Sequence, residues 1–218
     1  MSIQNSSYIP ALKYNWLTRF YDKLISKFLR ERVWKELIIA SIINHKPVKI
    51  LDVGCGTATL TIMLQKEFRA ASVTGIDGDN SILAIADKKV KESSLNISLK
   101  EALSYELPFN DNHFDLVVSS LMLHHLTDEN KKRTMMEIHR VLKPGGQCII
   151  ADWGKPKNRV IRWAFYLVQV LDGFATTASN VKGLLPAMLI DNDFVAIKEL
   201  YRIPTVLGSI SIITSKKP

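Results

Sequence analysis

The chain has 218 residues, of which 47% are hydrophobic and 23% charged, and this usage is typical of a globular protein that buries its core without disulfides or metal staples. The formal net charge of +8 divides into +6 over residues 1–49, −3 over residues 50–152 and +5 over residues 153–218. The two cysteines, Cys55 and Cys148, exclude a disulfide scaffold and a four-cysteine zinc module.

The basic flanks are compatible with a nucleic acid, an anionic substrate or an anionic membrane surface as partner, or simply with solvated lysines. The N-terminus has no basic start followed by an apolar run, so we expect no signal peptide. The longest apolar stretch, 160–171, contains Arg162 and is too short to span a bilayer. We therefore expect a soluble, cytoplasmic protein, or at most one attached to a membrane surface.

The predicted elements change character along the chain. Residues 1–46 are expected to form a helical cap, because Trp16, Phe20, Leu24 and Phe28 recur at about one helical turn. Strands are then predicted at 48–53, 71–76, 95–99, 114–120 and 147–151, with helices at 57–68, 80–90 and 128–142 between them. Such alternation is typical of a parallel sheet covered by helices on both faces.

The predicted second domain covers residues 47–218 and includes a helical insert at about 155–192, with helices to about 172 and at 180–190. Two β-rich runs, 195–201 and 205–214, close the chain, and we expect them to form an antiparallel pair at one edge of the sheet. The fold class predicted is therefore α/β, a doubly wound, mostly parallel seven-stranded sheet with an antiparallel C-terminal edge strand and an N-terminal helical cap.

The clearest local signal is the run Leu-Asp-Val-Gly-Cys-Gly-Thr at 51–57, which ends a strand and opens a helix. Gly54 permits a tight turn, and Gly56 lets the backbone approach a ligand. Asp52, at the end of that strand, suits a ligand with an ammonium group and would repel a pyrophosphate. Asp77, at the end of the next strand, can accept two hydrogen bonds from a ribose diol.

This run resembles motif I of the class I S-adenosylmethionine-dependent methyltransferases. Further matching segments follow in order, namely Leu-Pro-Phe at 107–109, Phe-Asp-Leu-Val at 114–117, Leu-His-His-Leu at 123–126 and Leu-Lys-Pro-Gly-Gly at 142–146. Tyr-Asp at 21–22, Trp34 and Asp-Trp-Gly-Lys-Pro at 152–156 are most similar to the ubiquinone/menaquinone-biosynthesis type (methyltransferase type 11). The resemblance implies a Rossmann-like fold, with S-adenosylmethionine as cofactor and S-adenosylhomocysteine as product.

The resemblance also implies which residues hold the cofactor. Asp52 and the glycine loop would hold the methionine part, Asp77 the ribose, the loop after the third strand the adenine, and the end of the fourth strand the region below the sulfonium. The full set is Tyr21, Asp52, Gly54, Cys55, Gly56, Asp77, Gly78, Ala102, Leu103, Ser104, Ser119 and Ser120. One departure is Leu103, which stands where the family commonly has an acid that accepts a hydrogen bond from adenine. The loss of one such bond costs about 1 kcal/mol.

Candidate catalytic residues follow the fourth and fifth strands. His124 and His125 come at the expected methyl end of the cofactor, where histidine can take a proton near neutral pH. Asp152 ends the fifth strand and is a second candidate base. We predict no metal, because no acid or cysteine stands near the two histidines at ligand spacing.

These observations predict methyl transfer to a small, hydrophobic or aromatic acceptor that is quinone-like, phenolic or lipid-like. A non-catalytic scaffold that binds S-adenosylmethionine remains open because of Leu103. An RNA methyltransferase fits the charge, yet the segment after the fourth strand, Ser-Ser-Leu-Met at 119–122, lacks the Asn/Asp-Pro-Pro-aromatic motif, and we expect no nucleic acid. A nucleotide-dependent oxidoreductase would not explain Asp52. Peripheral membrane contact is compatible with the sequence, and the sequence leaves the oligomeric state open.

Overall fold

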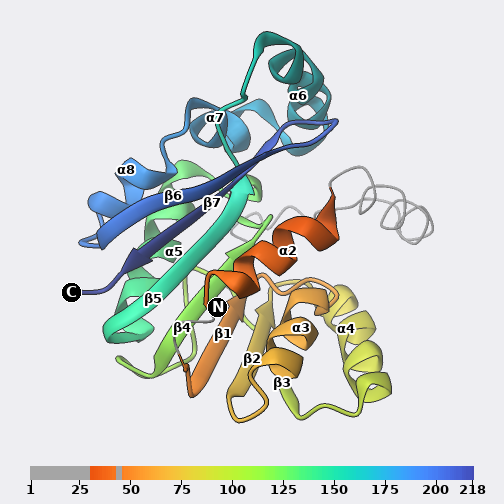
Figure 1. Ribbon diagram of the computed structural model, residues 1–218, viewed down its shortest axis with the longest axis vertical. Coiled ribbons are helices and arrows are strands. Elements are labelled where there is room, and N and C mark those ends of the chain that lie inside the picture. The colour runs from red at the N-terminus through yellow and green to blue at the C-terminus, as the bar shows by residue number, and fades with distance from the viewer. Residues whose placement is uncertain (1–29, 43–45) are drawn as a thin grey trace, which may run out of the picture.

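A computed structural model describes residues 30–42 and 46–218 of the chain (Figure 1). The strands are β1 (Lys49–Val53), β2 (Ser72–Asp77), β3 (Ile97–Glu101), β4 (Phe114–Ser120), β5 (Leu142–Trp153), β6 (Val195–Pro204) and β7 (Ser209–Lys216). The helices are α2 (Glu31–Ala40), α3 (Thr59–Glu67), α4 (Asn80–Ser93), η1 (Leu123–His125), α5 (Asp128–Val141), α6 (Arg159–Asp172), α7 (Phe174–Lys182) and α8 (Leu185–Ile190).

The strands form one seven-stranded sheet in the order β3-β2-β1-β4-β5-β7-β6. The pairs from β3 to β5 are parallel, and β7 is antiparallel to both β5 and β6. The predicted fold class is thus confirmed. The C-terminal strand β7 is not the edge strand that we expect, because it pairs with both β5 and β6 and leaves β6 at the edge. The strand order reverses between β1 and β4, and ligands of open α/β sheets bind at the carboxyl ends of the strands near such a point.

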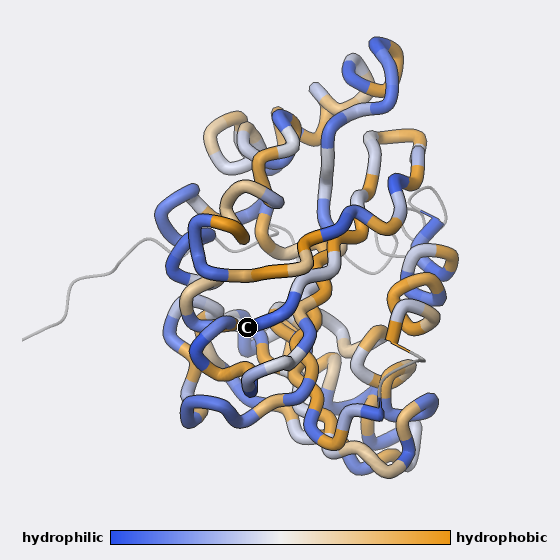
Figure 2. The backbone as a smooth tube through the Cα atoms, turned by 60° about the vertical axis from the view of Figure 1, so that its left-hand side comes forward, coloured by the Kyte–Doolittle hydropathy of each residue, from blue (hydrophilic) through white to orange (hydrophobic). Residues whose placement is uncertain are grey.

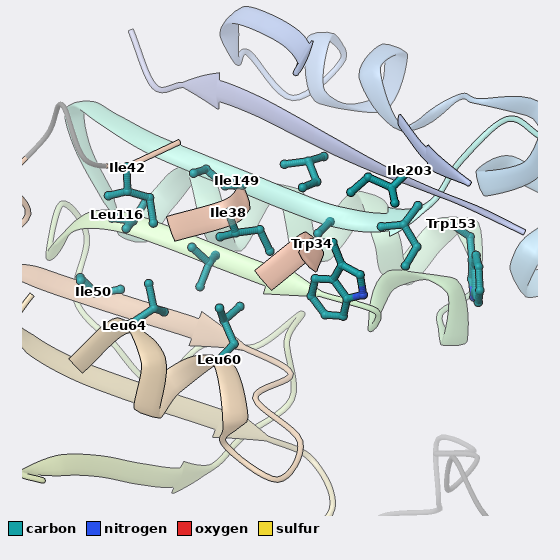
Figure 3. Close-up of a cluster of buried hydrophobic side chains, with 14 of the residues drawn as sticks. Trp34, Ile38, Ile42, Ile50, Leu60, Leu64, Leu116, Ile149, Trp153 and Ile203 are labelled. Carbon is teal, nitrogen blue, oxygen red and sulfur yellow. The ribbon is translucent and has the colours of Figure 1, made fainter. Parts of the chain in front are cut away.

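Hydrophobic side chains cover both faces of this sheet. On one face, α2 and α3 bury Trp34, Ile38, Leu60 and Leu64 against the sheet (Figure 3). On the other face, a second cluster joins residues of α5 and α8, such as Ile138, to the strands. Figure 2 shows the same arrangement, with hydrophobic residues along the central strands and hydrophilic residues at many outer turns. The two hydrophobic clusters, one on each face, hold the sheet in place and thereby fix the positions of its strand ends.

Strand β5 is longer than predicted, because it begins at Leu142 and includes the Lys-Pro-Gly-Gly segment that we expected to be a turn. The register against β4 shifts there, from Leu142 opposite Phe114 to Gln147 opposite Leu116. The C-terminal segment stabilises the irregular part, since the Gly145 N–H donates to Lys217 O and the Lys217 N–H donates to Gly146 O, both at 3.0 Å.

The insert after β5 also differs in detail from the prediction. Residues 174–182 form α7, whereas the sequence predicts that this helix begins only at residue 180. The helix expected over 180–190 is interrupted by Gly183, whose φ of +74° ends α7 before α8 begins. Tyr21 and most of the predicted cap, 1–46, lie outside the described residues. Among the residues that are described, no helix has the length and apolar character needed to cross a membrane.

Candidate active site

The glycine loop after β1 has a backbone that favours small residues. Gly54 and Gly56 have φ values of +72° and +53°, a region that glycine enters without steric cost. The N–H groups of Gly54 and Cys55 both donate to the carbonyl of Ile76 in β2, at 2.9 and 2.8 Å. A Cβ on Gly54 would lie 2.4 Å from Met122 Cγ, so the loop also needs glycine to pass the segment after β4.

Asp52 is fully buried just before this loop, and only one of its carboxylate oxygens is bonded. Its Oδ2 accepts a hydrogen bond from the Thr61 hydroxyl at 2.7 Å, while its Oδ1 has no partner among the described residues. The hydroxyl of Ser119, next to Val53 on β4, is likewise buried without a described partner. Burial raises the pKa of Asp52 to about 6, against the effects of the Thr61 bond and of Lys35. An unsatisfied buried acceptor is costly, and a ligand ammonium would satisfy it.

Asp77, at the end of β2, is held in place by the backbone. Its Oδ2 accepts from the Gly56 N–H at 2.9 Å and its Oδ1 from the Asp79 N–H at 3.0 Å. Burial raises the pKa of Asp77, while these backbone bonds act in the opposite direction. Each oxygen still has a lone pair for a second donor. The backbone therefore fixes the orientation of the carboxylate and leaves each oxygen able to accept one further hydrogen bond.

A cavity of about 230 Å³ opens beside Asp77. Its lining comes from the ends of β1, β2, β3 and β4, and consists of Gly54, Asp77, Gly78, Asp79, Ile82, Ala102, Leu103, Ser104, Tyr105, Leu121, Met122, His125 and Leu126. The structure therefore brings together much of the predicted cofactor set. Its mixture of two carboxylate residues, Asp77 and Asp79, with backbone groups and apolar side chains suits a nucleoside.

Several residues of the predicted cofactor set do not line this cavity, namely Asp52, Cys55, Gly56, Ser119 and Ser120. Cys55 is buried, and burial raises the pKa of its thiol, which therefore stays protonated. Ser119 is buried and Ser120 half-buried, so Leu121 and Met122 form that wall. Ser104 does line the cavity, and its hydroxyl is hydrogen-bonded to that of Thr134 at 2.9 Å. The family commonly has an acid at the position of Leu103, and Glu101 is the acid nearest to it in the sequence. Glu101 is exposed at the end of β3 and does not line the cavity, so it does not supply the missing carboxylate.

His124 lies in η1, immediately after β4, and is held between two carboxylates. Its Nδ1 is 2.8 Å from Asp152 Oδ1, at the end of β5, and its Nε2 is 3.6 Å from Asp172 Oδ2, at the end of α6. Burial alone would lower the pKa of His124, but the attraction and hydrogen bond of Asp152, followed by Asp172, raise it above its ordinary value. His124 and Asp152 thus form a buried acid–base dyad, and we use "the dyad" for these two residues.

His125 has the opposite electrostatic environment. His125 is among the residues that line the cavity beside Asp77. Burial and the neighbouring His124, whose ring centroid is 4.0 Å away, lower the pKa of His125 to about 3. His125 is therefore neutral at physiological pH and can accept a hydrogen bond from a ligand.

Asp172 was missed by the sequence analysis, and no local motif marks it. It belongs to the helical insert and reaches η1 only because α6 and α7 fold back over the sheet. One ligand atom from each of His124, His125 and Asp172 lies within 4.8 Å of the other two. An acid from a distant part of the chain thus stands near the two histidines, contrary to the expectation from sequence spacing. The absence of a metal remains a prediction.

Known proteins resemble this chain in sequence and in fold. A methyltransferase domain family matches residues 50–146. Demethylmenaquinone methyltransferase from Staphylococcus carnosus is 35% identical over 150 residues, which is 67% of this chain and 61% of that protein. The protein of the same name from Lactiplantibacillus plantarum is 33% identical over 161 residues, 71% of this chain and 67% of that protein.

The fold has solved counterparts as well. A SAM dependent methyltransferase from Aquifex aeolicus superposes with a TM-score of 0.62 at 19% identity, covering 84% of this chain and 89% of that one. The chain thus spans about two thirds of the curated relatives and most of this neighbour. It belongs to the class I S-adenosylmethionine-dependent methyltransferases, the enzyme family whose methyl donor is S-adenosylmethionine.

Proposed function

We propose that this chain transfers a methyl group from S-adenosylmethionine to a small quinol or phenol with an apolar tail. The observation that carries the proposal is the dyad, because a buried histidine fixed by a carboxylate lies next to the cofactor cavity. The names of the two relatives, which specify demethylmenaquinone, favour a quinone-derived acceptor.

The described residues fit S-adenosylmethionine. The unpaired Oδ1 of Asp52 would take its ammonium group, Asp77 its ribose hydroxyls, and the loop at 102–104 its adenine. When bound there, the cofactor supplies an electrophilic methyl group on a sulfonium. Because this group is already activated, the protein has mainly to place the acceptor, exclude water and remove a proton.

The dyad performs the proton removal in this proposal. His124 takes the proton of the acceptor hydroxyl at Nε2, while Asp152 keeps the Nδ1 proton in place and stabilises the imidazolium that forms. The electron pair left on the acceptor then forms the new bond to the methyl carbon. His125 and Asp172 flank the same space and can orient the acceptor hydroxyl.

Apolar aromatic groups surround the dyad on the side of the insert. The Trp153 ring lies 6.2 Å from that of His124 and 5.2 Å from that of Phe165 in α6, with all three side chains buried. Such an environment favours a hydrophobic acceptor and keeps water away from the proton transfer. A cofactor-binding scaffold without activity is the second candidate, and the observation that favours it is Leu103 in the cavity wall.

A direct test is a methyl-transfer assay with reduced and oxidised quinones, simple phenols, amines and carboxylic acids. We expect a gain of one methyl group by the reduced quinone or phenol, with one S-adenosylhomocysteine formed per product, and little reaction with the oxidised quinone. S-adenosylhomocysteine binding without any turnover across the panel would favour the scaffold, and selective turnover of amines or acids would contradict the quinol proposal.

A further inference from the structure

Helix α6 carries apolar residues on two faces, and only one face is buried. Phe165 and Val168 pack into the core, with 1% and 6% of their surface exposed. A second set lies on the outer face, with exposed fractions between 58% and 77%, and consists of Val160, Trp163, Leu167, Val170 and Leu171. The spacing of 160, 163, 167 and 170 places these side chains on one side of the helix.

This outer face continues into neighbouring aromatic residues. The ring centroids of Trp163 and Tyr166 are 5.5 Å apart, and those of Tyr166 and Phe174 are 6.4 Å apart. Single exposed apolar residues are ordinary on protein surfaces, whereas a contiguous stripe of this kind marks a site of contact. We call Val160, Trp163, Tyr166, Leu167, Val170, Leu171 and Phe174 the α6 outer face.

Exposed basic residues flank the α6 outer face in the sequence, and we call them its rim. Lys155, Lys157 and Arg159 precede or begin the helix and are exposed, and Lys182 ends α7. The acid nearest in the chain, Asp172, has its carboxylate toward His124 instead of toward this rim. The whole segment 153–218 has nine basic and four acidic residues, a net +5. The rim is therefore complementary to an anionic surface.

We propose that the α6 outer face binds the surface of an anionic phospholipid bilayer, with the helix lying in the plane of the interface. An amphipathic helix with tryptophan and leucine on its apolar side and basic residues beside it is suited to the headgroup region. Figure 1 shows α6 at one extremity of the molecule, beyond the carboxyl end of β5, where a flat surface can reach it.

Charge argues against two other partners for the α6 outer face, namely a second copy of this chain and residues 1–29. A second copy of this chain docked through the same face would place the same basic rims against each other. Residues 1–29, which lie outside the described part of the chain, have four basic residues and one acidic residue, and so share the sign of the rim. An anionic bilayer satisfies both the apolar face and the charge.

Bilayer contact would also place the site appropriately for an apolar acceptor. The C-terminal residue of α6, Asp172, contacts the dyad, so one helix connects the proposed lipid face to the reactive groups. The inference itself depends on the surface of α6 and is independent of the acceptor's identity, so its test needs no acceptor.

The test is vesicle flotation of the full chain with phosphatidylcholine alone or mixed with phosphatidylglycerol. We expect binding to the phosphatidylglycerol mixture, weakened by salt, and much less binding to phosphatidylcholine. Trp163→Ser combined with Leu167→Ser should lower binding by about tenfold or more. The matched control, Ile85→Ser with Met136→Ser, removes two side chains of similar exposure from α4 and α5 and should bind like wild type.

S-adenosylhomocysteine affinity, measured on each variant, reports whether the fold and the cofactor site are intact and separates this inference from the proposed function. Failure of the wild type to float with anionic vesicles would overturn the inference, as would equal flotation of both double variants. A wild-type dimer that is lost only in the α6 variant would assign the α6 outer face to a second copy of this chain. Flotation only after removal of residues 1–29 would assign it to that segment. Either result would overturn the inference of bilayer binding.

Discussion

Replacement of Asp152 by asparagine tests the dyad most closely, because it removes one charge and preserves the shape. Asp152 Oδ1 is 2.8 Å from His124 Nδ1 and also accepts from the Trp153 N–H at 2.6 Å, so asparagine can keep only part of this pattern. The His124 and Asp152 side chains are 5% and 1% exposed, so water screens the pair weakly. A hydrogen bond to a charged group contributes about 1.5–3 kcal/mol, and we expect a loss of stability of that size while His124 is protonated.

The pH dependence has a definite sign. The pKa of His124 is raised in the folded protein, so the pair's stabilisation is fully present below the unfolded pKa and is lost as the pH rises through the folded pKa. Asp152→Asn should therefore destabilise the protein more at acidic than at alkaline pH. As a base, His124 must be neutral, so kcat/KM should rise with pH, and its inflection should lie above the ordinary histidine pKa of about 6.5.

In the Asp152→Asn variant this inflection should move to lower pH, and the limiting rate should fall by about 100-fold, the lower range for general-base catalysis. The assay is S-adenosylhomocysteine formation across pH, with thermal unfolding on the same samples. Asp172→Asn should shift the inflection in the same direction by less, because its Oδ2 is 3.6 Å from Nε2. An unchanged inflection and rate in Asp152→Asn, with cofactor affinity intact, would refute the role of the dyad.

Further predictions concern the cofactor cavity and the metal. Asp77→Asn should weaken S-adenosylhomocysteine binding by about 10- to 100-fold in calorimetry, because one charged acceptor for the ribose is lost. Asp115→Asn is the control, because this carboxylate accepts from the Val48 and Lys49 N–H groups and does not line the cavity. It should lower stability and leave the affinity for S-adenosylhomocysteine unchanged. Equal losses of affinity in the two variants would undermine the ribose assignment. Leu103→Asp should tighten binding several-fold by restoring an acceptor for adenine, and weaker binding would argue against adenine at this wall. Treatment with EDTA should leave the rate unchanged, whereas a loss that a divalent ion restores would show that the two histidines hold a metal.

Local sequence signals were sufficient to predict that the glycine loop and Asp77 lie together at one edge of the sheet. Asp52 and Asp77 stand at the ends of two strands, and the glycine loop follows the first of them. The apolar residues of each strand indicate where it ends. Because parallel strands present their carboxyl ends at one edge, the position of these residues followed from topology. The unpaired oxygen of Asp52 is a detail that only packing reveals, since it depends on how Thr61 is turned toward the other oxygen.

The surroundings of His124 were less accessible from sequence. His124 and Asp152 were chosen separately as candidate bases, and their pairing depends on β4 and β5 lying side by side. Asp172 carries no motif, and its approach to His124 depends on how the insert folds over the sheet. The Lys-Pro-Gly-Gly segment is typical of a turn, but bonds to Lys217, far along the chain, hold it within β5. Contacts between distant segments thus account for each of these differences.

Calorimetric titration with S-adenosylhomocysteine beside NAD+ tests the central claim most directly. The arrangement of Asp52 and Asp77 predicts one-to-one binding of S-adenosylhomocysteine and no signal with NAD+, whose pyrophosphate the buried Asp52 would repel. Binding of NAD+ in preference to S-adenosylhomocysteine, or binding of neither, would contradict the assignment of this cavity.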